Sequence, residues 1–329
     1  MDANPFHLGE REAQALAGVQ PPGAAIRSFM PDQHRMFFAQ LPLLLAGVAD
    51  QAGWPVATAL AGPPGFVSSP DPCVLHIAAA PALADPATSG LRAGVPIGLL
   101  GIDLGTRRRN RANGTVTALG MDGITVSVLQ SFGNCPQYIQ TRDAKDAEEP
   151  ARPAAVECLA GLDWAAQAIV VGADTFFVAS GSGGRGGEAG GMDVSHRGGR
   201  PGFVRVDGDV LTIPDFRGNR YFNTLGNLLL NPRVGLLFID FTTGNLLQLQ
   251  GCAEIVWDGE EVRSFVGAER LWRVRVTAGW RRRVVLPVRW TFRDYAPTTE
   301  RTGAWNTAAA MGCESGAIEL LGNHRKAGT

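Results

Sequence analysis

The pattern of apolar and polar positions occurs twice along this chain. A segment with helical periodicity at Asp32–Gln40 precedes an apolar strand at Leu43–Val48, and the same order recurs at Asp163–Val171 and Thr175–Ala179. After each of these strands the pattern predicts a strand, a turn, a second strand, a helix and an apolar strand. The chain is therefore expected to contain two domains built from the same succession of elements.

Short landmark sequences mark the repeat. The stretch 65–123 recurs at 202–259, and the run GLLGIDLGT, which begins at Gly98, returns 137 residues later as GLLFIDFTT at Gly235. A period this long indicates a duplicated domain, because the repeating units of solenoids are only 20 to 50 residues long. The function must therefore be explained with two related domains.

The strongest hairpin signal lies in the second copy. Phe203–Val206 and Val210–Ile213 flank an Asp207-Gly208 pair, where a type I′ turn requires positive φ at both central residues. A helix at Tyr221–Leu230 is predicted next, and then a nearly continuous apolar strand at Val234–Phe241. Many short strands with one or two helices per copy predict a mainly β, α+β fold of two closed or partly closed antiparallel barrels.

Composition shifts suggest the domain boundaries. We expect an N-terminal helical extension over 1–28, a first barrel over 29–142, a linker over 143–160, a second barrel over 161–296 and a tail over 297–329. The linker is placed where charged residues, alanine and proline are concentrated.

Composition excludes several classes of protein. The net charge of −1 gives no global field that would attract nucleic acid or a membrane surface. The five cysteines are an odd number without CxxC spacing, which argues against a disulfide framework and against a metal site of the zinc type. With no secretory signal pattern and no apolar run long enough to span a bilayer, we expect a soluble, cytoplasmic protein.

Arginines and glycines are concentrated around the second hairpin. Neighbouring strands lie about 5 Å apart, so Arg200 and Arg220, which flank the hairpin, can converge on one anion such as a phosphate. The helix entered at about Asn219 adds free backbone N–H groups, and glycines at 198, 199, 202 and 218 let a planar ligand approach. The alternative is that these arginines are solvated beside a glycine-rich turn.

The second copy resembles the flavin-binding split barrel of the pyridoxamine 5′-phosphate oxidase family over roughly 163–257. In this family an arginine begins one strand and a basic residue follows five positions later, as Arg200 and Arg205 do here. Ile213-Pro214 stands where the family has an aromatic residue and a threonine, and Asn219-Arg220 stands at its Arg-Lys pair.

This resemblance implies a bound FMN, with Arg200, Asn219 and Arg220 near its phosphate and the backbone of Phe203 and Val204 beside its ring system. The other residues assigned to the cofactor are Arg197, Pro201, Gly202, Ile213, Pro214, Asp215, Arg217 and Gln248. The chain lacks the family's threonine at Pro214 and its C-terminal arginine and histidine pair, which grips the pyridoxal substrate. Flavin binding is therefore supported more strongly than vitamin B6 oxidation.

The first copy lacks the cations of this site. Pro63 and Ser68 stand where Arg200 and Arg205 would be, and Pro81–Ser89 offers no counterpart of Arg220. Family members commonly bind FMN between two barrels of a homodimer, so we expect either a homodimer or a pseudo-dimeric monomer with one degenerate flavin site. An arginine cluster of the first copy lines the cavity in this hypothesis, or else covers a solvated strand face: Arg107, Arg109 and Arg111, with Ser195 and His196 from the second copy.

The expected function is that of an FMN-dependent oxidoreductase that passes a hydride or electrons between flavin and a small molecule or nicotinamide. No catalytic acid or base is identified. Alternatives are a non-catalytic flavin- or haem-binding sensor, a deazaflavin protein and pyridoxamine 5′-phosphate oxidase itself. A separate reductase is a further expected partner.

Other motifs are given structural interpretations. Gly181, Gly183 and Gly186 form a GxGxxG pattern, but no helical periodicity follows, so we expect a loop that could cover the flavin. The arginines and tryptophans of 270–293 alternate as in a strand with one solvated face, which argues against nucleic acid binding. His196 is expected in a turn, and Cys135 is interpreted as a buried structural cysteine in preference to a reactive thiol.

Overall fold

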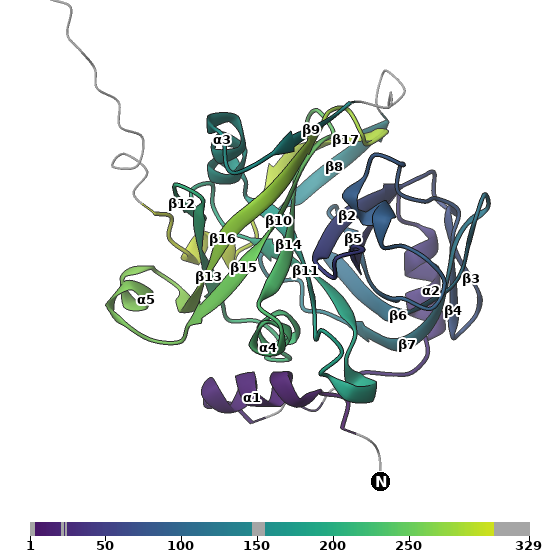
Figure 1. Cartoon of the computed structure of the whole chain (residues 1–329), viewed down its shortest axis with the longest axis horizontal. Coiled ribbons are helices and arrows are strands. Elements are labelled where there is room, and N and C mark those ends of the chain that lie inside the picture. Colours follow the sequence, from purple (N-terminus) through teal and green to yellow (C-terminus); the bar gives the residue numbers. More distant parts are fainter. Residues whose placement is uncertain (1–3, 21–22, 24, 147–154, 306–329) are drawn as a thin grey trace, which may run out of the picture.

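Two antiparallel sheets form the body of the computed structural model, which describes residues 4–20, 23, 25–146 and 155–305. Figure 1 shows the two sheets side by side, each curled into a split barrel and accompanied by at least one helix. The predicted fold class, mainly β with two split barrels, is confirmed.

The first barrel comprises one helix, a short 3-10 helix and seven strands. In chain order these are α2 (Asp32–Ala39), β1 (Leu43–Ala49), β2 (Pro55–Ala61), β3 (Val67–Asp71), β4 (Val74–Ile77), η1 (Pro86–Ser89), β5 (Pro96–Asp103), β6 (Arg108–Gly120) and β7 (Gly123–Gly133). The strands lie in the order β2-β1-β5-β6-β7-β4-β3.

The second barrel repeats this arrangement. Its elements are α3 (Trp164–Gly172), β10 (Thr175–Gly181), η2 (Gly187–Ala189), β11 (Met192–Gly198), β12 (Arg205–Asp207), β13 (Val210–Phe216), α4 (Asn223–Leu230), β14 (Arg233–Asp240), β15 (Asn245–Val256), α5 (Glu260–Ser264) and β16 (Ala268–Arg282). The order β11-β10-β14-β15-β16-β13-β12 matches the first sheet strand for strand, as a duplicated domain requires. One additional strand, β9 (Val156–Leu159), pairs with β16.

Three further segments lie outside the two repeats. Helix α1 (Leu8–Leu16) packs against α4, and β8 (Thr141–Asp146) pairs with β17 (Val288–Asp294). The expected linker at 143–160 is therefore corrected, because its first residues form β8 and four of its later residues form β9. Within the expected tail, η3 (Thr299–Arg301) is followed by described residues up to 305, and the remainder lies outside the described part of the chain.

The local predictions around the second hairpin are mostly correct. Asp163 caps α3 by accepting from the Ala166 backbone N–H at 2.8 Å, and α4 ends before the predicted break at Asn231-Pro232. The turn type is corrected. Because Asp207 pairs with Val210, the loop consists of Gly208 and Asp209, and only Gly208 has a positive φ, of 57°, which excludes type I′.

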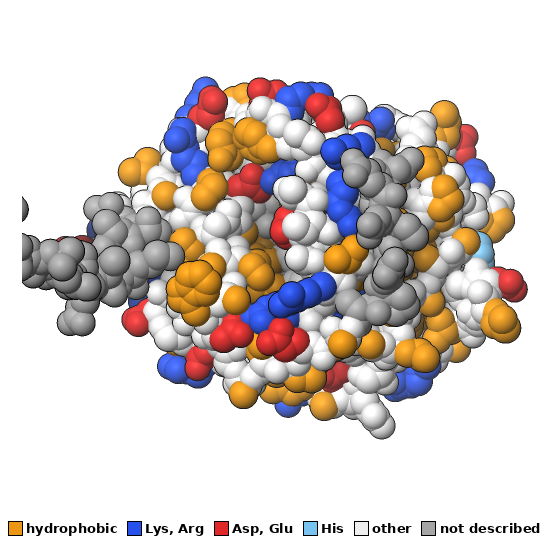
Figure 2. All heavy atoms as spheres, turned by 90° about the horizontal axis from the view of Figure 1, so that it is seen from above, with side chains coloured by type: hydrophobic (Ala, Val, Ile, Leu, Met, Phe, Trp, Pro, Cys, Tyr) orange, Lys and Arg blue, Asp and Glu red, His pale blue; other side chains and the backbone are white. Residues whose placement is uncertain are grey.

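The surface carries charges of both signs. On the face that holds α3 and the β8–β17 pair, acidic and basic side chains are interspersed with apolar ones (Figure 2). None of the helices in the described residues is long and apolar enough to cross a membrane.

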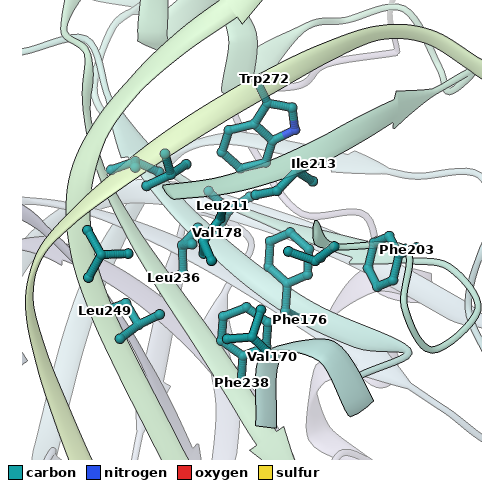
Figure 3. Packing of buried hydrophobic residues seen from close by; sticks show 14 of the residues in the cluster. Val170, Phe176, Val178, Phe203, Leu211, Ile213, Leu236, Phe238, Leu249 and Trp272 are labelled. Carbon is teal, nitrogen blue, oxygen red and sulfur yellow. The ribbon is translucent and has the colours of Figure 1, made fainter. Parts of the chain in front are cut away.

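Each barrel has its own hydrophobic core. In the second barrel Phe176, Phe203 and Phe238 pack together beneath Trp272, with ring centroids 5.1 to 6.4 Å apart where they meet Phe176 (Figure 3). These four side chains are almost completely inaccessible to solvent. They fix the inner face of β10 and thereby the position of β11, which carries several of the predicted site residues.

A third apolar cluster joins the barrels. It unites outward-facing residues of both sheets, among them Leu43 and Leu100 of the first with Phe177, Val194 and Leu237 of the second. The contact depends on the two landmark glycines. A Cβ on Gly98 would lie 2.7 Å from the Asp193 Cα of β11, and a Cβ on its counterpart Gly235 would collide with the Pro55 carbonyl of β2. The repeated glycine is therefore explained by the close approach of the two sheets.

A buried polar cluster lies at one end of this junction. Asp85, at the start of η1, accepts from the Thr58 hydroxyl at 2.5 Å, from Arg282 at 2.5 Å and from Gln248 Nε2 at 3.1 Å. The Asp85 and Arg282 side chains are only 1% and 5% exposed. Each charge is compensated mainly by the other, because ion pairs hidden from water depend on complete pairing.

The burial of the Asp85–Arg282 pair predicts a large effect of Asp85→Asn. The substitution leaves the Arg282 charge buried without a counter-charge, so the free energy of unfolding should fall by about 3 to 5 kcal/mol. Urea unfolding measures the difference. The matched control is Asp143→Asn, because Asp143 pairs with Arg293 at the surface, where both side chains are about half exposed and the loss should stay below about 1 kcal/mol. Equal losses in both variants would show that burial does not make the Asp85 pair special.

Candidate functional site

A pocket with a cavity volume of about 110 Å³ opens between the two repeats. Strand β6 and the segment after β7 supply its first-repeat side, and β11, the loop after β13 and the start of α4 supply its second-repeat side. The lining includes Arg109, Arg111, Asn134, Cys135, Gln137, Tyr138, Ser195, His196, Arg197, Phe203, Pro214, Asp215, Asn219, Arg220, Phe222, Asn223, Thr224, Leu225, Glu269 and Arg270.

Ten of the residues expected at the cofactor or cavity line this pocket. They are Arg109 and Arg111 from the first repeat and Ser195, His196, Arg197, Phe203, Pro214, Asp215, Asn219 and Arg220 from the second. The structure thus brings the arginines of β6 to the same place as the arginines around the second hairpin. The expectation that His196 lies in a turn is wrong, because it belongs to β11 and faces the pocket.

Arg200 does not line the pocket, which corrects its expected convergence with Arg220. Strand β11 ends at Gly198, and the chain then turns, with the Phe203 N–H donating to the Arg200 carbonyl at 2.9 Å. Strand β12 begins only at Arg205. The exposed Arg200 side chain instead donates to the Glu300 carbonyl at 3.1 Å.

Two further expected residues face elsewhere. Arg107 precedes β6 in a left-handed conformation and donates to the carbonyls of Ile139 and Tyr295 at 2.9 and 3.1 Å. Gln248 occupies the position in the second repeat that Arg111 occupies in the first. It therefore faces the first repeat, where its side chain contacts Asp85. The remaining expected residues that do not line the pocket are Pro201, Gly202, Val204, Ile213 and Arg217.

Physical reasons separate these five from the pocket. Val204 and Ile213 are 1% and 0% exposed and belong to the second core. Gly202 has no side chain, and its backbone N–H donates to the Val171 carbonyl. Pro201 and Arg217 have exposed side chains. The Arg217 carbonyl nevertheless accepts from the Tyr138 hydroxyl at 3.2 Å and so links the two repeats beside the pocket.

The pocket carries an excess of positive charge. Asp215 pairs with Arg197 and, at 2.7 Å, with Arg270. Arg111 pairs with Asp193 at 3.0 Å. Among the ion pairs of the described residues, none involves Arg109 or Arg220. Two guanidinium groups in the pocket wall are thus without a carboxylate partner.

Burial shifts the ionisation of these groups. It lowers the pKa of Arg109 to about 10 and holds the pKa of His196 well below its usual value, to which the nearby Arg109 also contributes. His196 is therefore neutral. Arg109 Nη1 lies 3.1 Å from His196 Nδ1, and because a guanidinium only donates, Nδ1 accepts and the ring proton is on Nε2.

Five buried polar atoms in the pocket wall have no hydrogen-bond partner among the residues that the structure describes. They are the Nε atoms of Arg109, Arg111 and Arg197, Asn134 Nδ2 and His196 Nε2. All five are donors. Because buried donors are rarely left unpaired, the wall is suited to a ligand rich in acceptors and preferably anionic.

FMN fits this chemistry, since its phosphate is a dianion and its ring system carries carbonyl acceptors. The enclosed volume is smaller than the roughly 300 to 1,000 Å³ typical of sites for ligands of such size. A ligand of the size of FMN would therefore extend beyond the enclosed part of the pocket or displace side chains that line it. Among the described residues, no group of three histidine, cysteine or acidic side chains is placed to hold a metal ion.

The start of α4 contributes backbone to the pocket. The helix begins at Asn223, four residues later than the expected Asn219, and no side chain in the described part of the chain caps it. Its first three residues line the pocket, which suits an anion at a helix N-terminus. The approach is strained, because Arg220 and Phe222 have φ values of 62° and 60°, a conformation that costs non-glycine residues of order 1 to 3 kcal/mol each.

Helix α1 supports this strained segment from outside. A Cβ on Gly226 of α4 would lie 2.6 Å from the Glu10 backbone, so the two helices approach closely. The Asn223 amide donates to Glu10 Oε1 at 2.5 Å, and Gln14 Nε2 donates to the Arg220 carbonyl at 3.3 Å. Burial, followed by the negative charge of Asp193, raises the pKa of Glu10 to about 8.

Several pocket residues were not predicted from the sequence. Thr224 donates to the Ser195 hydroxyl at 2.9 Å, and its only signal was a place in the helix after the glycine-rich turn. Asn134 and Tyr138 belong to an irregular segment without periodicity. Arg270 was assigned to a solvated strand face, whereas the structure buries it against Asp215.

Comparisons with known proteins support the resemblance seen in the sequence. The family model described as pyridoxamine 5′-phosphate oxidase matches residues 164–284, which is nearly the whole second barrel. The resemblance is therefore confirmed for this repeat. Among curated proteins, none matches the chain.

Solved structures similar to part of the chain include a variant of HupZ from Group A Streptococcus. It is 12% identical, and the similarity covers 36% of this chain and 98% of that one, with a TM-score of 0.28. A second is provisionally described as a 5-nitroimidazole antibiotic resistance protein from Bacteroides thetaiotaomicron. It is 16% identical over 42% of this chain and 97% of its own, with a TM-score of 0.27.

The buried Glu10 generates a prediction about pH. Its pKa is raised in the folded state, so the folded protein binds a proton more tightly than the unfolded chain, and the stability gained in this way is lost as the pH rises from 4.5 to about 8. Glu10→Gln cannot ionise, and its single amide oxygen can accept from only one of the two donors, the His7 N–H or the Asn223 amide. That loss is the same at every pH. The free energy of unfolding of Glu10→Gln, relative to that of the wild type, should therefore be higher at pH 9 than at pH 5 by on the order of 2 to 5 kcal/mol.

Urea unfolding at the two pH values measures this gain. The matched control is Glu12→Gln, because Glu12 lies exposed on the same helix. Its effect on stability should be the same at both pH values. A pH-independent difference for Glu10→Gln would show that Glu10 is ionised in the folded protein.

Proposed function

We propose that the pocket binds FMN and that the protein is a flavin-dependent oxidoreductase. The observation that carries this proposal is the wall of five unpaired buried donors beside two arginines that lack carboxylate partners. A ligand with a phosphate and several ring acceptors satisfies such a wall, whereas an apolar ligand leaves every donor unpaired. The match of the second barrel to the oxidase family points to the same ligand.

We expect the phosphate near Arg220, Asn219 and the first turn of α4, because these groups combine an unpaired guanidinium, an amide and a helix N-terminus. Arg109 and His196 would then donate to acceptors elsewhere on the cofactor. Bound FMN supplies two-electron chemistry by hydride transfer, and the protein supplies its position and electrostatic environment.

The side chains of the pocket favour one form of this chemistry. The guanidinium groups stabilise negative charge on a bound acceptor, and their burial strengthens the effect. The neutral His196 offers a hydrogen at Nε2 and does not act as a base while Arg109 donates to its other nitrogen. Substrate is therefore expected to exchange a hydride without deprotonation by His196.

Both repeats contribute to the pocket, so we propose that one chain acts as a pseudo-dimer with one cofactor. The duplication creates an equivalent place between β2 of the first repeat and β15 of the second. There Thr58 stands in place of Ser195, and Gln248 stands in place of Arg111. Asp85 already supplies the anion there. Electrons would come from a nicotinamide directly or through a separate reductase.

The first test is the visible absorption spectrum of the purified protein, followed by heat release and quantification of flavin per chain. About one FMN per chain is expected, and anaerobic addition of NADH or NADPH should bleach the flavin band. Tight flavin without a response to either reductant or to a reductase would favour a binding protein. Failure to bind added FMN would overturn the proposal.

Substitutions of two arginines that flank the hairpin test whether the phosphate binds in the pocket or at the surface. Arg220→Ala should weaken FMN binding by about 1.5 to 3 kcal/mol, the range for a hydrogen bond to a charged group. Arg200→Ala is the matched control, since Arg200 lies on the same hairpin but outside the pocket, and its affinity should stay near that of the wild type. Fluorescence quenching of added FMN measures the affinity of both variants. A larger loss of affinity in Arg200→Ala than in Arg220→Ala would show that the phosphate binds near Arg200 and not in the pocket.

A further inference from the structure

Cys135 lies in the wall of the pocket, two residues after the end of β7. The side chain is half-buried, and its sulfur lies 3.7 Å from Arg109 Nη2, within the distance at which a guanidinium donates to sulfur. The Gln137 side-chain oxygen lies 3.6 Å from the same sulfur. The expectation of a buried structural cysteine is therefore wrong, because Cys135 belongs to no apolar cluster and faces the cavity.

Arg109 has no carboxylate partner in the described residues, although three other arginines of the pocket wall do. The group beside it that can take a negative charge is the sulfur of Cys135. A thiol next to an arginine and open to a cavity has the surroundings of a reactive cysteine, because the cation stabilises the thiolate that reacts.

A second observation shows that this place is prepared for a ligand. His196 is 7% exposed, lines the same pocket and has an unpaired Nε2, while its Nδ1 accepts from the same Arg109 that donates to sulfur. Arg109 thus joins a potential nucleophile to a buried donor. Both groups line the same pocket.

We propose that Cys135 is an oxidation site that reacts with hydroperoxides. The thiolate sulfur attacks the terminal oxygen of the hydroperoxide, so that an S–O bond forms and the O–O bond breaks. Sulfur loses two electrons and becomes a sulfenic acid, and the other oxygen leaves as an alkoxide or hydroxide that takes a proton from water. Arg109 stabilises the sulfur before the attack, and the proposal does not depend on a bound flavin.

The remaining cysteines of the described residues provide internal controls. Cys73, Cys158 and Cys252 are all exposed, so accessibility alone predicts that they react faster than Cys135. For none of them does the structure contain a hydrogen bond from an arginine to the sulfur. A preference for Cys135 therefore reports its environment and not its exposure.

The experiment treats the full-length protein, stripped of any flavin, with substoichiometric hydrogen peroxide in the presence of dimedone, and quantifies adducts by peptide mass spectrometry. We expect Cys135 to be labelled about ten times faster than Cys73, Cys158 or Cys252. Equal or slower labelling of Cys135 would overturn the proposal. Because this comparison is made within the wild-type protein, it does not depend on the folding of a variant.

A pair of variants tests the role of the cation. Arg109→Gln should slow the labelling of Cys135 about tenfold. The matched control is Arg108→Gln, because Arg108 is the exposed neighbour that stacks on Phe37 at 4.9 Å and does not line the pocket. Labelling of Cys135 that is fast in all three proteins would show that Arg109 does not activate the sulfur and would overturn the proposal.

Addition of FMN separates this proposal from the proposed function. If both are correct, FMN protects Cys135 from labelling, because the two compete for the same wall. Fast labelling of Cys135 that FMN does not change would leave the oxidation site intact and count against the flavin site.

Discussion

The close approach of the two sheets at Gly98 and Gly235 is the constraint on which the rest of the structure depends. Each glycine lies against a backbone strand of the other repeat, so a side chain at either position would drive the barrels apart. The contact brings β6 of the first barrel within reach of β11 of the second. Only in this arrangement do arginines separated by about ninety residues in sequence form one wall.

The duplication creates two equivalent places between the repeats, and buried positive charge is compensated differently in each. In the first, Asp85 provides an internal anion for Arg282, and the polar groups around it are largely satisfied. In the second, Arg109 and the unpaired donors lack such a group. Isolated buried cations are unfavourable. The second place therefore lacks a negative charge, which an anionic ligand can supply.

Much of the fold could be predicted from the sequence, because apolar periodicity and repeated landmarks report burial directly. The helices at 32–40 and 163–171 and the strands that follow them are close to their predicted bounds. The site was predicted only in part. Arg220 and Arg111 belong to it, but Arg200 does not, since the turn after β11 is set by backbone hydrogen bonds that leave no periodic signal. Residues of irregular segments, such as Asn134 and Tyr138, were missed for the same reason.

The covalent link between the repeats has a consequence for how the site responds to dilution. A pocket shared by two separate barrels exists only while the barrels stay associated, and its occupancy falls as the protein becomes scarce. Here both halves belong to one polypeptide, so the local concentration of each half around the other is fixed by the chain. The pocket between β6 and β11 can therefore assemble in a cell that contains very few copies of the protein.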